Sequence, residues 1–193
     1  MERSFSVITA SILRPTLFDT CKSVERQDYW SWEHIVVVDI PAHEVTPEQH
    51  KLLDAIRHPK RTIVHCQSRH KNYGNTCRNE AFKLVASDYL LYLDDDDVHT
   101  GEVFKTLNEQ IRDEVWGIFP ITRLGELFLL VPPGWCRTCS NQFYYKPLYP
   151  YPDPDTDEYA ADGMLINTLR ENHPYRIIRS GPLARVDKES LGQ

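Results

Sequence analysis

Four consecutive aspartates, Asp94 to Asp97, follow directly on the apolar run Tyr89-Leu-Leu-Tyr-Leu93. The apolar run predicts a strand that is buried on both faces. The four carboxylates repel one another, and a fold tolerates them most easily where a cation offsets their charge. The junction therefore indicates a central strand that ends in a charged turn.

Strands and helices are expected to alternate up to this junction and just beyond it. Strands are predicted at residues 5–10, 34–38, 62–65 and 89–93, and helices from Thr16, Thr46, about Asn75 and about Glu102. Thr16 with Asp19 three residues later, and Thr46 before Pro47, carry signals of helix N-termini. The third helix is expected to bury one face, formed by Cys77, Ala81, Leu84 and Val85. This alternation predicts βαβ crossovers and a mostly parallel sheet.

The pattern changes after residue 115. Strands are predicted at 116–122 and 127–131, joined through Leu124 and Gly125, followed by a helix at 158–171 and a strand at 175–179. We therefore expect an α/β fold, with an open, mostly parallel central sheet flanked by helices and an added antiparallel element in the second half. All 193 residues are expected to form one domain.

Composition limits the class of protein. The formal charge of -6 argues against a nucleic-acid binder that works by broad phosphate neutralisation. The sequence shows no signal peptide and no apolar run long enough to span a membrane. Its five cysteines are expected to be thiols in a reducing compartment, so we expect a cytoplasmic protein.

The charged turn has a chemical interpretation of its own. Carboxylates at a strand end offer hard oxygen ligands for Mg²⁺ or Mn²⁺ and leave coordination positions open for a diphosphate. Ligands of open α/β sheets bind at the carboxyl ends of the strands, where this turn lies. A solvated acidic loop is the alternative. The turn alone does not identify a reaction, because phosphatases, nucleases and nucleotidyltransferases use similar ones.

Several segments together resemble the family-2 type of glycosyltransferase with the GT-A fold. They are Phe5-Ser-Val-Ile-Thr-Ala10 with Arg14-Pro15, Glu33-His-Ile-Val-Val-Val-Asp39, Cys77-Arg-Asn-Glu-Ala81, and Ala86 to Asp94 with the acidic turn. The segments occur in the order and at the spacings of that family. The resemblance implies a metal-dependent, inverting enzyme that moves a sugar from a nucleotide donor, a UDP-sugar, to a glycan or other hydroxyl acceptor. Residues 1–97 would bind the nucleotide and residues 98–193 would face the acceptor.

The resemblance also implies roles for residues at the first two strand ends. Thr9, Ala10 and Ser11 match the loop that wraps the nucleotide. Asp39 matches the acidic residue that hydrogen-bonds the base, where a carboxylate would accept the imide N–H of uracil. A plain turn residue before Pro41 is the other interpretation of Asp39. The Asp-Gly-Ser tail usual in the family is replaced here by Ile40-Pro41.

Further roles are implied on the third helix and in the acidic turn. Arg78 and Asn79 match positions that line the nucleotide pocket, although a solvent-facing arginine is the commoner fate of such a residue. The Asp-X-Asp pattern of the family falls on Asp94, near ribose and metal, and on Asp96, the direct metal ligand. Asp95 lies at the variable position of this pattern and is expected to contact the nucleotide.

Asp162, in Ala160-Ala-Asp-Gly-Met-Leu165, best matches the family's catalytic base, which would deprotonate the acceptor hydroxyl. The family usually has an acidic pair there, whereas Ala161 precedes Asp162. The nearby acids that could take the role instead are Asp155, Asp157 and Glu158.

Other residues carry weaker signals. Cys136 and Cys139 have the spacing of half a zinc site, and packed thiols are the default interpretation. His65, His70 and His99 flank the predicted site, with His99 a candidate for assisting phosphate binding and His173 for a third metal ligand. A platform for sugar rings or a core segment would each explain the aromatic and amide residues Trp135, Asn141, Gln142, Phe143, Tyr144 and Tyr145. The proline-rich stretch 147–156 is either an acceptor-side loop or a linker.

Three competing functions make different demands. A sugar nucleotidyltransferase would carry a glycine- and lysine-rich loop near the first strand, and Thr9 to Arg14 contains no glycine. A P-loop NTPase would need a Gly-x-x-x-x-Gly-Lys-Ser/Thr element, which the sequence lacks. A catalytically inactive nucleotide-binding module would keep the fold, but the intact Asp94 and Asp96 pair weighs against it.

Overall fold

The computed structural model describes residues 2–123, 126–128, 143–152 and 161–186, and the statements below concern these residues. The first half of the chain contains β1 (Phe5–Ser11), α1 (Leu17–Glu25), β2 (Trp32–Val38), a 3-10 turn η1 (Ala42–Glu44), α2 (Pro47–Ala55), β3 (Arg61–His65), α3 (Asn75–Phe82) and β4 (Tyr89–Tyr92). The second half contains β5 (Val98–His99), α4 (Val103–Gln110), β6 (Trp116–Ile118), β7 (Ile121–Arg123), β8 (Glu126–Phe128), β9 (Phe143–Tyr145), α5 (Ala161–Asn172), β10 (Tyr175–Ile177) and β11 (Ala184–Val186).

A seven-stranded sheet runs through the molecule in the order β10-β6-β9-β4-β1-β2-β3. Strands β4, β1, β2 and β3 are parallel, and β10 is parallel to β6. The predicted fold class is confirmed. The sequence did not predict β9, which lies between β4 and β6 and is antiparallel to both.

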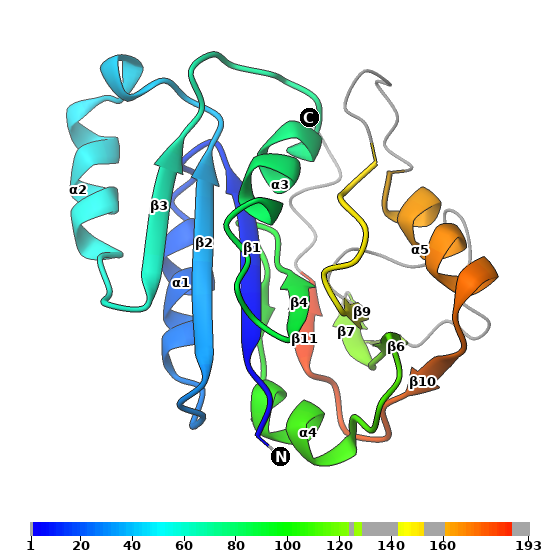
Figure 1. Cartoon of the computed structure of the whole chain (residues 1–193). Helices are drawn as coiled ribbons and strands as arrows, with labels where there is room; N and C mark the ends of the chain where they lie inside the picture. The colour runs from blue at the N-terminus through cyan, green and yellow to red at the C-terminus, as the bar shows by residue number, and fades with distance from the viewer. Residues whose placement is uncertain (1, 124–125, 129–142, 153–160, 187–193) are drawn as a thin grey trace.

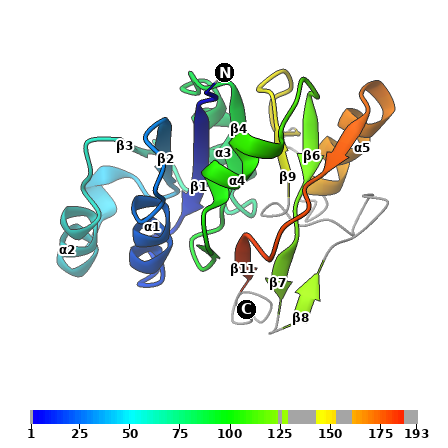
Figure 2. The same ribbon diagram turned by 90° about the horizontal axis from the view of Figure 1, so that it is seen from below.

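Helices cover both faces of this sheet because its strands bury side chains on both sides. Phe5 and Val7 of β1 pack with α1 and α4, whereas Ile8 of the same strand packs with α3 and α5. Figures 1 and 2 show α3 and α5 on one face and α1 on the other. Each face therefore receives alternate residues of the same strand, as a doubly covered sheet requires.

A smaller sheet, in the order β5-β11-β7-β8, lies on the α1 side of the large sheet (Figure 2). Its β7–β8 pair is antiparallel, which confirms the predicted antiparallel element. The single strand predicted at 116–122 is wrong, because the chain leaves the large sheet after Ile118 and enters the small one at Ile121. Pro120 lies between the two strands and has no N–H to continue a ladder.

Helix N-termini follow the prediction at one site and depart from it at another. Thr46 forms the complete capping box with Gln49. The predicted cap at Thr16 is wrong: its backbone is already helical, with φ of -59°, and its side chain makes no capping bond. The first amides of α1 are satisfied by backbone instead, since Leu17 N–H donates to the carbonyl of Arg14 at 3.1 Å.

The third helix is shorter than predicted. It ends at Phe82, and the amide of Leu84 closes a turn on the carbonyl of Ala81 at 2.9 Å. Cys77 and Ala81 are buried as expected, but Leu84 is exposed. Among the described residues no helix is long and apolar enough to cross a bilayer.

Candidate functional site

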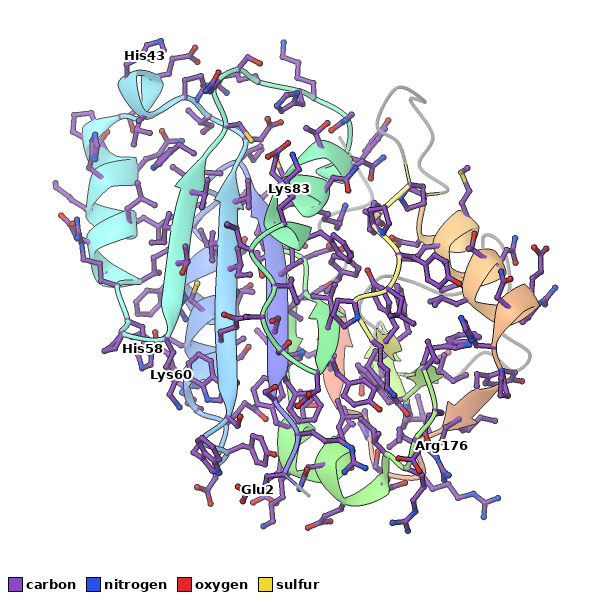
Figure 3. All side chains as sticks on the ribbon, in the orientation of Figure 1. Glu2, His43, His58, Lys60, Lys83 and Arg176 are labelled. Carbon is purple, nitrogen blue, oxygen red and sulfur yellow. The ribbon has the colours of Figure 1, made fainter. Side chains whose placement is uncertain are left out.

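The carboxyl ends of four parallel strands bring the predicted site residues to one edge of the large sheet. Ser11 ends β1, Asp39 follows β2, Cys66 follows β3 and Asp94 closely follows β4. In Figure 1 the arrows of β1, β2 and β3 point to the top of the view, where α3 also lies. Figure 3 shows His43 at this end of the molecule and Lys60 at the opposite end, where β3 begins.

The acidic turn is a closed backbone turn with an arginine against it. Asp97 N–H donates to the carbonyl of Asp94 at 3.1 Å. The Arg14 guanidinium lies 2.9 Å from a carboxylate oxygen of Asp96 and 3.3 Å from one of Asp95. The loop after β1 therefore supplies positive charge to the turn after β4.

Asp95 is the most deeply buried of the first three aspartates, with 5% of its surface exposed. Burial raises the pKa of its carboxyl to about 6, although the Ser11 hydroxyl donates to it at 2.6 Å and Arg14 pairs with it. Asp95 thus ties the turn to the end of β1 through the side chain of Ser11.

Arg78 is buried in α3, so the solvent-facing interpretation of this arginine is wrong. It donates to the carboxylate of Asp94 at 2.6 Å and to the carbonyl of Tyr73 at 2.7 Å. Its guanidinium lies 5.1 Å from the ring centroid of Tyr151. Burial lowers the pKa of Arg78, but the charges of Asp94 and Asp162 outweigh that effect and leave the pKa above its usual value.

Asp162 reaches this cluster from the second half of the chain. It lies in the first turn of α5 and accepts a hydrogen bond from the Tyr151 hydroxyl. Because its charge raises the pKa of Arg78, Asp162 lies within electrostatic range of the arginine that holds Asp94. One buried guanidinium therefore connects the acidic turn with the predicted base.

Asp39 organises the loop that follows β3. Its two carboxylate oxygens accept the backbone N–H groups of His70 at 2.8 Å and Lys71 at 3.1 Å. Only 6% of its surface is exposed. Asp39 is therefore a fixed acceptor at the strand end, with the loop from Cys66 to Gly74 folded around it.

Thr9, Ala10 and Asn79 were also predicted to contact the nucleotide, and they differ in burial and in their contacts. The Thr9 hydroxyl is buried at 3.0 Å from His34 Nε2, so its side chain is committed to the interior. Ala10 lies against the turn into α3: a Cβ on Gly74 would come within 2.7 Å of the Ala10 Cβ. Gly74 also has a φ of +79°, so this close approach depends on glycine. Asn79 is half-buried on α3.

The acidic turn has the donor set of a hard divalent cation. Asp94 and Asp96 both offer carboxylate oxygens, and the Asp94 side chain is 37% exposed. Two arginines, Arg14 and Arg78, offset the negative charge of the turn. Arg14 is the more exposed, with 44% of its side-chain surface accessible. A cluster that binds cationic groups through oxygen atoms fits the chemistry of Mn²⁺ or Mg²⁺, which Asp94 and Asp96 would hold.

Two histidine hypotheses are wrong. His99 is buried, stacks edge-on against Phe104 and has its pKa lowered to about 3 by desolvation, so it offers no charge to a phosphate. His173 lies beyond the C-terminal end of α5, roughly 16 Å along the helix from Asp162. It pairs with the Tyr149 hydroxyl at 3.1 Å. His65 is bonded to the carbonyl of Ile40, and His70 contributes through its backbone.

The aromatic stretch proved to be core where the structure describes it. Phe143, Tyr144 and Tyr145 form β9 and are fully buried, so the sugar-platform interpretation is wrong for them. Several other candidates lie outside the described residues: Trp135, Cys136, Cys139, Asn141, Gln142, Asp155, Asp157 and Glu158.

Sequence reasoning missed Tyr151 as a site residue. Its hydroxyl donates to Asp162, and its ring packs edge-on against Tyr92 with centroids 5.0 Å apart. The only signal was its place in the proline-rich stretch. The ion pairs of Arg14 were also missed, although its position directly after the first strand was a signal.

Known proteins resemble this chain in sequence and in fold. The sequence profile of "Glycosyl transferase family 2" matches residues 6–125. The crystal structure of S. aureus TarS 1–349 with UDP-GlcNAc superposes with a TM-score of 0.78 at 14% identity, covering 96% of this chain and 59% of that one. The mannosyltransferase PcManGT from Pyrobaculum calidifontis, with GDP-Man and Mn²⁺, gives 0.68 at 15%, covering 94% and 55%.

A second, longer structure of TarS extends well beyond the part that matches this chain. The crystal structure of S. aureus TarS gives a TM-score of 0.73 at 14% identity, and the match covers 94% of this chain but 36% of TarS. The chain thus spans between about a third and three fifths of the length of these structures. At these identities the likeness shows the fold alone. No curated protein matches the chain.

Proposed function

The chain belongs to glycosyl transferase family 2, and from this premise we propose that it transfers a glycosyl group from a nucleotide sugar, a UDP-sugar, to an acceptor hydroxyl. One observation carries the proposal: buried Arg78 connects the acidic turn, through Asp94, with Asp162 on α5. A diphosphate-binding turn and a carboxylate base are the two groups that such a transfer needs. TarS with UDP-GlcNAc and PcManGT with GDP-Man and Mn²⁺ support a nucleotide-sugar donor.

The donor would lie along the carboxyl ends of β1, β2 and β4. Asp39 would accept the imide N–H of uracil, because the two backbone amides hold its carboxylate in place and each oxygen keeps a free lone-pair direction. Residues 1–97 would therefore bind the nucleotide, and residues 98–193 would form the acceptor side of the same domain.

Asp94 and Asp96 would hold Mn²⁺ or Mg²⁺ at the diphosphate. The bound cation supplies positive charge that stabilises the leaving nucleoside diphosphate. Arg14 would release Asp96 for this purpose, since its partly exposed side chain can turn toward the phosphates instead. Arg78 would stay in place, because it is buried and its guanidinium also donates to the carbonyl of Tyr73, just before α3.

Asp162 would accept the proton of the acceptor hydroxyl. The Tyr151 hydroxyl would orient its carboxylate through the hydrogen bond that it donates. Attack from the side opposite the leaving diphosphate would invert the configuration at the anomeric carbon.

The test is calorimetric titration with UDP in the presence and absence of Mn²⁺. Asp96→Ala is expected to lose the Mn²⁺-dependent part of the binding, a weakening of at least about tenfold, because it removes a metal ligand. Asp54→Ala removes an exposed carboxylate on α2 that pairs with Arg57, and should bind like the unmodified protein. Unchanged binding by Asp96→Ala would remove the metal role of Asp96. Failure of every nucleotide tested to bind the unmodified protein would overturn the proposed function.

A further inference from the structure

Two cysteines and an aspartate meet at the ends of β2 and β3. The proposed transfer uses the aspartate alone and gives the cysteines no role. The sulfur atoms of Cys66 and Cys77 are 3.5 Å apart, and a carboxylate oxygen of Asp39 lies within 4.8 Å of both. Cys66 and Asp39 are brought together by strand pairing, since the amide of Cys66 donates to the carbonyl of Val38 at 2.9 Å. Cys77 reaches them from the first turn of α3.

We infer that Asp39, Cys66 and Cys77 form a binding site for a thiophilic divalent cation of the Zn²⁺ class, separate from the acidic turn. The ligand chemistry differs between the two sites: thiolates select zinc-like ions, whereas an all-carboxylate turn suits Mg²⁺ or Mn²⁺. Three protein ligands leave a fourth position for water.

The sulfur spacing fits a shared metal better than a disulfide. Two sulfurs bound to one tetrahedral zinc at about 2.3 Å each are about 3.8 Å apart. A disulfide requires about 2.05 Å, so these atoms would have to approach by about 1.5 Å. The observed 3.5 Å lies close to the metal spacing.

The carboxylate is held as a metal ligand should be. Both of its oxygens accept backbone N–H groups, from His70 and Lys71, and such outer contacts fix the orientation of a ligand. Asp39 is buried, and within the described part of the chain no arginine or lysine side chain pairs with it. A dication here would balance a buried negative charge.

The two thiols differ in exposure, since Cys66 is 7% exposed and Cys77 is fully buried. An ion would therefore reach the site past Cys66.

The experiment is titration of the metal-free full chain with CdCl₂, followed through the ultraviolet thiolate-to-cadmium absorption band. The chain carries Cys136→Ser and Cys139→Ser as its background, so that this closely spaced pair contributes no band. This background protein is expected to give a saturable band at one equivalent, which ZnCl₂ removes by displacement. Cys66→Ser and Cys77→Ser should each lose most of it, and Asp39→Asn should keep a band but bind at least about tenfold more weakly. Cys21→Ala, which removes a remote buried thiol, and Asp96→Ala, in the acidic turn, should retain the full band.

A second measurement needs no variant. Zn²⁺ should protect Cys66, the more exposed of the two site thiols, from a thiol-alkylating reagent when labelled peptides are identified by mass spectrometry. Absence of a saturable band, a band retained by the Cys66→Ser/Cys77→Ser double variant, or equal labelling with and without Zn²⁺ would each overturn the inference. Recovery of Cys66 and Cys77 joined as a disulfide from the freshly purified protein would do the same.

One consequence rests on the proposed function. Because the ion would take the carboxylate assigned to uracil, UDP and Cd²⁺ should exclude one another, and saturating UDP should weaken Cd²⁺ binding at least about tenfold. Simultaneous binding of both would disprove this exclusion and leave the metal site standing. A metal-free protein that binds Cd²⁺ but no nucleotide would contradict the proposed function alone.

Discussion

The two halves of the chain contribute to the site in different ways. In the first half strands and helices alternate, β1 to β4 are parallel, and the site residues lie close to strand ends or on α3. In the second half β9 is antiparallel, and β6 and β7 belong to different sheets although only two residues separate them. The first half therefore builds its part locally, whereas the second half depends on contacts between distant segments.

The residues assigned to donor binding lie in the first half, and the proposed catalytic base lies in the second half. Ser11, Asp39, Arg78 and Asp94 all come from the first half, and their contacts would survive changes in α5. Asp162 and Tyr151 come from the second half and touch the first half at Arg78 and Tyr92. Variants of the second half should thus affect turnover with donor binding intact, and the following predictions test this from the largest effect to the smallest.

Asp162→Asn should have the largest effect. It keeps the volume of the side chain and an acceptor for the Tyr151 hydroxyl, but it removes the base. We expect the transfer rate to fall by about 10² to 10⁴ while calorimetric affinity for the donor is unchanged. Glu171→Gln, an exposed carboxylate change on the same helix, is the control and should keep full activity. Full activity of Asp162→Asn would place the base elsewhere.

Each half of the chain contains a buried histidine, and the two differ in their ring contacts. His34 in the first half is bonded at both ring nitrogens, to Thr9 and Arg61, whereas the ring nitrogens of His99 in β5 have no hydrogen-bond partner among the residues that the structure describes. Burial lowers the pKa of His99 to about 3, below the value of about 6.5 expected in the unfolded chain. Below pH 6.5 the unfolded state gains a proton that the native state cannot bind, so stability is lost as pH falls toward 3.

His99→Leu should remove this loss of stability at low pH. Between pH 7.5 and pH 4.5 the unmodified protein is expected to lose about 2 to 3 kcal/mol of unfolding free energy through His99, measured by urea denaturation. The variant should show a pH dependence weaker by that amount. His43→Gln, at an exposed histidine of the first half (Figure 3), is the control and should leave the pH dependence as it is. Parallel pH profiles for His99→Leu and the unmodified protein would contradict the prediction.

Tyr151→Phe should have an intermediate effect on turnover. The ring, and with it the contacts to Arg78 and Tyr92, is kept, and only the hydrogen bond to Asp162 is lost. A hydrogen bond to a charged group contributes about 1.5 kcal/mol, so kcat should fall roughly tenfold. The KM for the donor should change little, because the residues assigned to donor binding lie in the first half of the chain.

Tyr149→Phe provides the matched control for Tyr151→Phe. It removes a hydroxyl from the same segment, but one that pairs with His173 at the far end of α5. We expect its kcat to match that of the unmodified protein. Equal losses in the two variants would show that the segment acts through folding and not through Asp162.

The sequence predicted the site best where the signal was local. The order of β1 to β4 and the acidic turn followed from apolar runs and the residues directly after them. The partners of those residues were not predictable, because Arg14 and Asp95 are 81 positions apart and Arg78 and Asp94 are 16 apart, and periodicity carries no information on which side chains meet. The same holds for β9, whose aromatic residues suit a sugar platform and a central strand equally well.

The smallest predicted effect comes from a change in the first half of the chain. Thr46→Ala removes the capping box of α2, in which the Thr46 hydroxyl accepts the Gln49 N–H at 3.3 Å and the Gln49 side chain accepts the Thr46 N–H at 3.0 Å. Loss of such a cap costs about 1 kcal/mol of unfolding free energy, measurable by urea denaturation. Because the contact is local and remote from Asp162, kcat and donor affinity should stay within error. A fall in kcat would show that the first half transmits changes to the chemistry, and the division between a binding half and a chemical half would then fail.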